Sequence, residues 1–259
     1  MIFIAILDPV MSMNKEKGVK YSIEHNAGYQ QHLKWVKTYC AQHRIQLQEP
    51  IIIPTLDMNW KEYDCASYVK KQLSLAFSKY DNIYVYFHCH GQTSEEGEFV
   101  YLNKQSKLYD TELMAILKQN KAYHITMFFE TCHSSGLYDP KPDWYVVAKQ
   151  VPQNPKYVYN FIPVNGKMTL CAAPGNFTLF FCSITEDQSY TKTRTDTKSG
   201  DTIACGLATN TIIQVLNGKS MFDYKPTEIR NLLNKELYNT DHPQYAIVES
   251  PVLIPVWFF

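Results

Sequence analysis

The 259-residue sequence predicts an α/β fold in which one mostly parallel sheet of about six strands is covered by helices on both faces. Predicted strands and helices alternate four times in the first half, as in sheets built from crossover units. The strands are continuous apolar runs, which is typical of strands buried on both faces. Neither a repeat nor a low-complexity tract interrupts the pattern, so we predict a single domain over residues 1–259.

The first half contains four predicted strands and three predicted helices. Apolar runs predict strands at 2–7, 49–56, 82–90 and 124–132, and the segment 98–103 reads as part of a hairpin. Apolar residues at helical spacing predict helices at 25–45, 60–77 and 109–120, the last with Asp110 or Thr111 as its N-cap. These elements form a half that ends at residue 137.

The second half, 167–259, completes the predicted sheet. It contains predicted strands at 167–173, 177–184 and 252–259, a polar stretch at 185–201, and predicted helices at 202–216 and 226–238. The segment 138–166 is rich in Pro, Tyr and Asn, which predicts a long loop between the two halves.

Composition narrows the possible functions. Lys and Arg total 25 and Asp and Glu total 25, so the net charge is zero and a nucleic-acid partner is disfavoured. Apolar runs are too short for a membrane span or a secretory signal. Seven widely spaced cysteines without a CxxC pair argue against a disulfide framework and a zinc site. We therefore expect a soluble, cytoplasmic protein with neither a membrane partner nor a metal ion.

Chemistry-bearing residues follow two of the predicted strands. The strand at 82–90 ends in "HCHG", and the strand at 124–132 runs into "ETCHSSG". Active sites of open α/β sheets gather at the carboxyl ends of the strands. If the two strands are parallel neighbours, His90 and Cys132 lie side by side at one edge of the sheet.

These residue types suit nucleophilic catalysis. A cysteine thiolate is a competent nucleophile, and a nearby imidazole can accept the thiol proton. Gly91 has no side chain and lets a substrate approach, and its N–H and that of Cys132 can form an oxyanion hole. Glu130 lies on the same face as Cys132 and can line a pocket for a basic or amide side chain. By the same alternation His88 shares a face with His90, so either histidine can be the base.

The alternative is that Cys132 is an inert core thiol, which is the commoner role of a cysteine on a buried strand. We assign that role to Cys65, Cys171, Cys182 and Cys205. For Cys132, the combination of His–Gly at one strand end and Glu-x-Cys at the other favours catalysis.

Both motifs resemble those of the caspase–haemoglobinase superfamily (clan CD) of cysteine peptidases. "DNIYVYFHCHG" is similar to the strand that ends in the catalytic His–Gly of legumains, and "MFFETCHSSG" resembles the cysteine motifs of legumains and metacaspases. The resemblance implies a caspase-like three-layer sandwich, protein or peptide substrates, and hydrolysis through a Cys–His dyad and a thioester acyl-enzyme. It implies no organic cofactor and sets no oligomeric state.

Carried over by position, the resemblance makes His90 the base and Cys132 the nucleophile, with oxyanion-hole amides from Gly91 and Cys132. It places Glu130 and Asp187 in substrate binding, which implies a preference for Arg or Lys at P1, with Asn next. The segment after His–Gly lacks the aspartates of calcium-dependent metacaspases, so we expect no calcium requirement. Two alternatives stay open: a catalytically silent regulatory or scaffold homologue, and a transpeptidase or transamidase.

Overall fold

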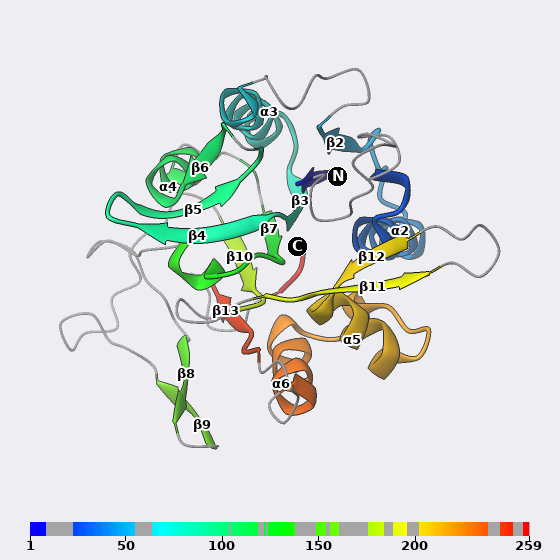
Figure 1. Ribbon diagram of the computed structural model, residues 1–259. Coiled ribbons are helices and arrows are strands. Elements are labelled where there is room, and N and C mark those ends of the chain that lie inside the picture. The colour runs from blue at the N-terminus through cyan, green and yellow to red at the C-terminus, as the bar shows by residue number, and fades with distance from the viewer. Residues whose placement is uncertain are drawn as a thin grey trace.

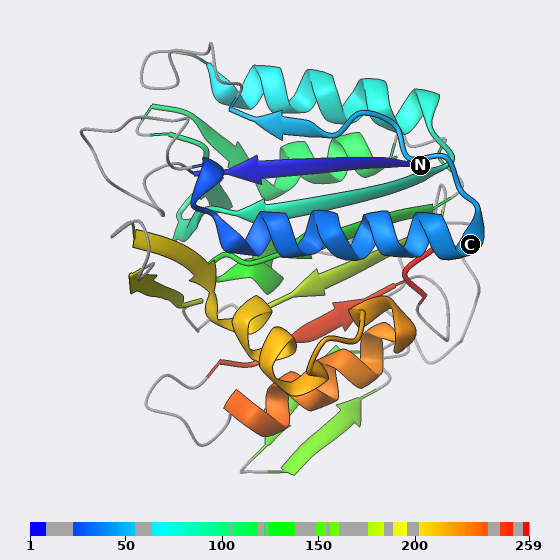
Figure 2. The ribbon, with the colours of Figure 1, turned by 90° about the vertical axis from the view of Figure 1, so that its right-hand side faces the viewer.

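A six-stranded sheet forms the centre of the molecule, in the order β13-β10-β7-β3-β1-β2. The computed structural model describes residues 1–8, 23–54, 64–103, 105–118, 122, 124–137, 149–153, 156–160, 176–183, 189–195, 202–237, 244–250 and 256–258. The strands of this sheet are β1 (Ile2–Leu7), β2 (Ile51–Ile53), β3 (Asn82–His88), β7 (His124–Phe129), β10 (Asn176–Phe181) and β13 (Ile247–Glu249). All neighbours pair in parallel except β13, which is antiparallel to β10. Figure 1 looks onto the carboxyl ends of the parallel strands, and Figure 2 shows them from the side.

Helices cover both faces of this sheet. Figures 1 and 2 show three helices on one face, α2 (Ala27–His43), α5 (Leu207–Leu216) and α6 (Pro226–Leu237), and two on the other, α3 (Cys65–Lys79) and α4 (Asp110–Lys118). Each layer of helices encloses its own hydrophobic cluster against the sheet. The predicted α/β class, a three-layer sandwich around a mostly parallel six-stranded sheet, is confirmed. None of the described helices combines the length and the hydropathy needed to cross a bilayer.

Burial on both faces explains why the strands read as continuous apolar runs. In β3, Val85 and Phe87 pack in the cluster beneath α3 and α4, whereas Tyr84 and Tyr86 pack in the cluster beneath α2 and α5. Because successive side chains of a strand point to opposite faces, a strand covered on both sides needs apolar or aromatic residues at every position.

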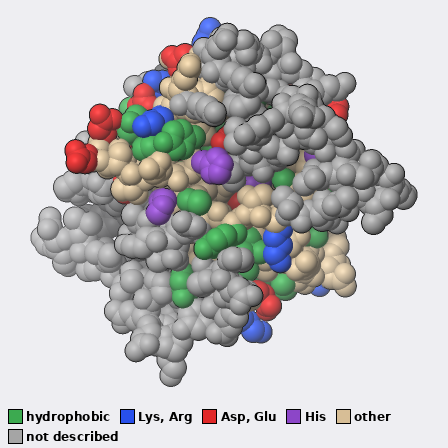
Figure 3. Space-filling view, in the orientation of Figure 1, with side chains coloured by type: hydrophobic (Ala, Val, Ile, Leu, Met, Phe, Trp, Pro, Cys, Tyr) green, Lys and Arg blue, Asp and Glu red, His purple; other side chains and the backbone are tan. Residues whose placement is uncertain are grey.

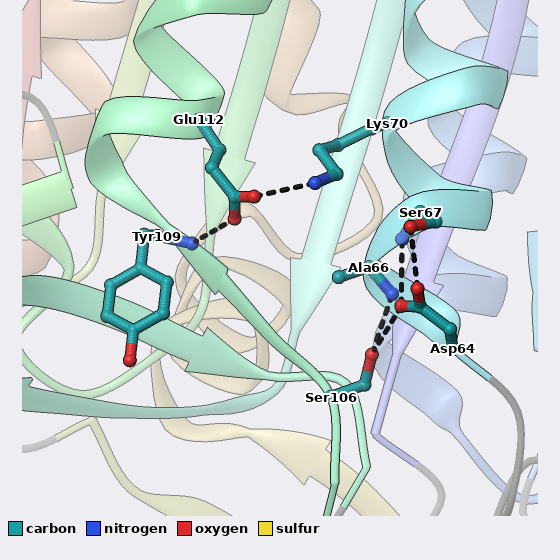
Figure 4. Close-up of polar contacts among 7 residues, drawn as sticks. All are labelled: Asp64, Ala66, Ser67, Lys70, Ser106, Tyr109 and Glu112. Carbon is teal, nitrogen blue, oxygen red and sulfur yellow. Dashed lines mark hydrogen bonds and ion pairs between the residues drawn. The ribbon is translucent and has the colours of Figure 1, made fainter.

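A polar cluster fixes α3 and α4 beside each other, as Figure 4 shows. Asp64 caps α3 by accepting the Ser67 N–H at 3.1 Å, and Ser106 donates to the same carboxylate at 3.2 Å. Glu112 of α4 accepts both the Lys70 ammonium at 2.6 Å and the Tyr109 N–H at 3.0 Å. The caps satisfy backbone donors that the first helical turns leave unpaired.

Short strands surround the central sheet. The segment expected to be part of a hairpin belongs to a three-stranded antiparallel sheet of β4 (His90–Ser94), β5 (Gly97–Tyr101) and β6 (Lys107–Tyr109). Within the predicted loop 138–166, β8 (Lys149–Gln153) and β9 (Lys156–Asn160) form an antiparallel pair. The strand expected at 167–173 lies outside the described residues.

The helix prediction for 202–216 was wrong over its first five residues. Thr202–Gly206 form strand β12, which pairs with β11 (Thr191–Thr195) inside the stretch read only as polar. The Ala204 N–H also bonds to the His25 carbonyl at 3.0 Å. Hydrogen-bond partners on both edges of β12 therefore outweigh the helical spacing of its apolar residues, and α5 begins only after Gly206.

Of the strand expected at 252–259, the structure describes only residues 256–258, and the rest lies outside the described residues. The described edge strand is Ile247–Glu249, and residues 256–258 are not in a strand. Trp257 and Phe258 are buried in the cluster beneath α2, α5 and α6. Their apolar character reflects packing against helices rather than pairing in the sheet.

Three buried histidines make the stability of this fold sensitive to acid. Burial lowers the pKa of His32 and His88 below the ordinary 6.5, and that of His124 to about 4. Between the folded and unfolded pKa values the unfolded chain binds more protons, so the stabilisation is complete above pH 6.5 and is lost as the pH falls toward 4. The lowered pKa of His124 alone should account for about 3 kcal/mol of this pH-dependent free energy of unfolding, at ~1.4 kcal/mol per pKa unit.

Urea unfolding between pH 7.5 and pH 4.5 measures this loss. A His124→Gln variant serves as the control, because it lacks the titrating ring and should show a shallower decline. A free energy of unfolding that stays constant over this range would contradict the assignment.

Candidate active site

The two motifs singled out in the sequence meet at the carboxyl edge of the sheet. Strands β3 and β7 are parallel neighbours, and the Glu130 N–H donates to the Phe87 carbonyl at 2.9 Å. Gly91 packs against the main chain of Cys132 so closely that a Cβ on Gly91 would lie 2.0 Å from the Cys132 carbonyl oxygen. This contact joins the His–Gly segment to the turn that carries Cys132, and it accounts for the glycine.

Cys132 lies in a tight turn after β7. The next residue, His133, has a φ of 53°, and Cys132 itself is partly exposed. The Ser189 N–H donates to Cys132 Sγ at 3.3 Å, and the Cys132 thiol donates to the Ser189 carbonyl oxygen at 3.4 Å. The turn is also held to the end of β10, because Ser134 Oγ donates to the Ser183 carbonyl at 3.0 Å. The thiol is thus both positioned and accessible.

His90 is the accessible imidazole of the site. Its side chain is 52% exposed, and its Nε2 lies 4.0 Å from Oδ2 of Asp8, which is only 3% exposed. Desolvation lowers the pKa of His90 below 6.5, so the ring is neutral at pH 7 and can accept a proton. Figure 3 shows histidine side chains in purple on this face, over the region of β4 and β7.

His88 occupies a different position from His90. It is fully buried, and its Nδ1 and Nε2 lie 3.0 Å from Asn26 Nδ2 and 3.2 Å from Thr191 Oγ1. A ring engaged at both nitrogens and closed to solvent holds neighbouring segments together. The alternation of side chains left both histidines open as the base, and of the two only His90 is exposed to solvent.

Sequence reasoning missed Asp8. The residue directly follows β1, which is the neighbour of β3, so its carboxylate reaches the same edge of the sheet as His90. The available signal was an acidic residue immediately after a buried strand, at the edge where sites of α/β folds form.

Glu130 lies beneath the site as a buried carboxylate. It is 1% exposed and accepts three hydrogen bonds, from the Tyr86 hydroxyl at 2.6 Å, the Thr209 hydroxyl at 2.7 Å and the Thr209 N–H at 2.9 Å. Thr209 is the third residue of α5, whose N-cap Gly206 offers no side-chain acceptor. Glu130, directly after β7, therefore caps the N-terminus of α5, where a negative charge is favourable.

Gly206 makes room for this carboxylate. A Cβ on Gly206 would lie 1.8 Å from Cδ of Glu130. The second predicted substrate-binding acid, Asp187, lies outside the described residues. Within the described ranges, no three His, Cys, Asp or Glu side chains are grouped in a way that could hold a metal ion.

Comparisons with known proteins show resemblance in the fold. No protein-family model and no curated protein match the sequence. At 10% identity, protein GSU0716 from Geobacter sulfurreducens has a TM-score of 0.54, with 98% of this chain and 96% of that chain covered. Caspase-1 from Spodoptera frugiperda has a TM-score of 0.46 at 10% identity, with 99% of this chain and 90% of that chain covered. The Drosophila initiator caspase Dronc has a TM-score of 0.44 at 10% identity, with 95% of this chain and 77% of that chain covered.

Proposed function

We propose that this chain is a cysteine endopeptidase in which Cys132 is the nucleophile and His90 the general base. The observation that carries the proposal is the close packing of Gly91 on the main chain of Cys132, which joins the His–Gly and Glu-x-Cys strand ends. The neutral, exposed His90 and the partly exposed thiol support it further.

In the proposed reaction, His90 accepts the Cys132 proton and the thiolate attacks the scissile carbonyl carbon. The N–H groups of Gly91 and Cys132 stabilise the oxyanion of the tetrahedral intermediate. His90 then donates its proton to the leaving amine, and a thioester remains on Cys132. Water, deprotonated by His90, attacks the thioester carbonyl and releases the acid product.

We assign substrate preference at P1 to negative charge near Cys132. The three donors to Glu130 are all neutral, and within the described ranges no basic side chain forms an ion pair with it. Because Glu130 is buried, it would attract a basic P1 side chain through its electrostatic field rather than by direct contact, and it would support the base of the P1 subsite. Asp187 would contribute the second acidic group of that subsite. A preference for Arg or Lys follows, with Asn next.

A panel of fluorogenic peptides with Arg, Lys, Asn or Asp at P1 tests this function. The wild-type chain should cleave the Arg and Lys peptides at least about tenfold faster than the Asp peptide. Cys132→Ala should abolish turnover, and the matched variant Cys205→Ala should retain it. Equal turnover by wild type and Cys132→Ala would overturn the proposal.

A P1 Arg acyloxymethyl ketone that labels Cys132 would report the nucleophile by mass. No labelling and no turnover would favour a silent homologue. Product masses in the presence of an added amine distinguish hydrolysis from transpeptidation, because both reactions share the thioester.

A further inference from the structure

An open cavity of about 560 Å³ lies between α2, the β11–β12 hairpin and α5. Figures 1 and 2 show the N-terminal ends of α2 and α5 on either side of this hairpin. The volume falls within the range of small-molecule sites, roughly 300–1,000 Å³. The lining residues do not include His90 or Cys132, so the cavity is distinct from the candidate active site.

The lining combines positive charge with an apolar surface. Lys34 of α2 and Lys192 of β11 contribute two ammonium groups, and Ile203 and Ile213 contribute apolar surface from β12 and α5. Among the described residues that line the cavity, none is acidic. Neither lysine forms an ion pair with a carboxylate in the described part of the chain.

We propose that this cavity binds a small organic anion. Its carboxylate or phosphate group would be held by Lys34 and Lys192, and its apolar body would cover Ile203 and Ile213. Side-chain amides, such as those of Gln31 and Asn210, can bind further polar groups. Two lysines that form no ion pair within the described ranges disfavour a cationic ligand. This inference is independent of the proposed peptidase activity.

The ligand would also stabilise the β11–β12 hairpin, because Lys192 and Ile203 belong to it. The hairpin is linked to the candidate active site through its entry: the N–H of Ser189, two residues before β11, donates to Cys132 Sγ, and Thr191 of β11 contacts the buried His88. A bound anion is therefore expected to reduce amide hydrogen exchange in β11 and β12.

Calorimetric titration of the Cys132→Ala protein with 1-naphthyl phosphate, 1-naphthoate and neutral 1-naphthol tests the site without any turnover. We expect saturable binding of at least one anion and much weaker binding of 1-naphthol. The tighter of the two anions identifies the preferred acidic group. The double variant K34Q/K192Q should lose at least about tenfold in affinity, since each charge-assisted contact is removed.

The matched variant K37Q/K219Q replaces two exposed lysines outside the lining and should bind as the parent does. Thermal unfolding of both double variants checks that the fold is intact. Failure of both anions to saturate, or equal affinity in K34Q/K192Q, would overturn the proposal. So would ligand-induced protection that spares β11 and β12.

Discussion

Replacing His90 by alanine should lower kcat/KM for a P1 Arg peptide about 10³-fold, the usual range for loss of a general base. The neutral His90 ring takes the proton from Cys132 and later returns it to the leaving amine, so two proton transfers lose their catalyst. Labelling of Cys132 by a ketone probe should slow in parallel. His43→Ala is the matched control, because this exposed histidine ends α2 far along the chain from either motif.

The variant Asp8→Asn tests whether Asp8 orients the imidazole of His90. The substitution keeps the shape of the side chain 4.0 Å from His90 but removes its charge. If Asp8 positions the imidazole, kcat should fall about tenfold while KM stays unchanged, since no substrate contact is lost.

For the His90→Ala variant, a wild-type kcat/KM would contradict the assignment of His90 as the base. His88 is then the residue to replace.

The sequence predicted the parts of the fold that depend on long apolar runs. Strands β1, β3, β7 and β10 are buried on both faces, so their continuous apolar composition is enough to predict them as strands. The contact of Gly91 with the main chain of Cys132 agrees with the expectation that parallel neighbouring strands bring their carboxyl ends together.

Contacts between distant segments explain what the sequence could not show. The spacing of apolar residues placed Thr202–Gly206 at the start of a helix, and its pairing with β11 on one edge and with the His25 carbonyl on the other makes it a strand. Thr209 reaches Glu130 across 79 positions, a pairing that no local pattern records. Asp8 is likewise an ordinary acidic residue until β1 is placed beside β3.

Gly206→Ala should lower the free energy of unfolding by about 3 kcal/mol, the upper range for overpacking a well-filled interior. The added Cβ would lie 1.8 Å from Cδ of Glu130, so the carboxylate or the start of α5 must shift. A shift breaks hydrogen bonds to Thr209 and Tyr86 that are closed to solvent. Urea unfolding measures the loss, and peptidase activity should fall with it because Glu130 is two residues from Cys132.

Two further variants separate this collision from the general effect of replacing a glycine. At Gly218 a Cβ meets nothing within 4 Å, and its φ of 92° limits the cost of Gly218→Ala to backbone strain, about 1–2 kcal/mol. The pair Gly206→Ala/Glu130→Ala should be less destabilised than the sum of the single variants, because removing the carboxylate leaves space for the new methyl group. Strictly additive losses would mean that Gly206 is required for its backbone conformation and not for the space that Glu130 occupies.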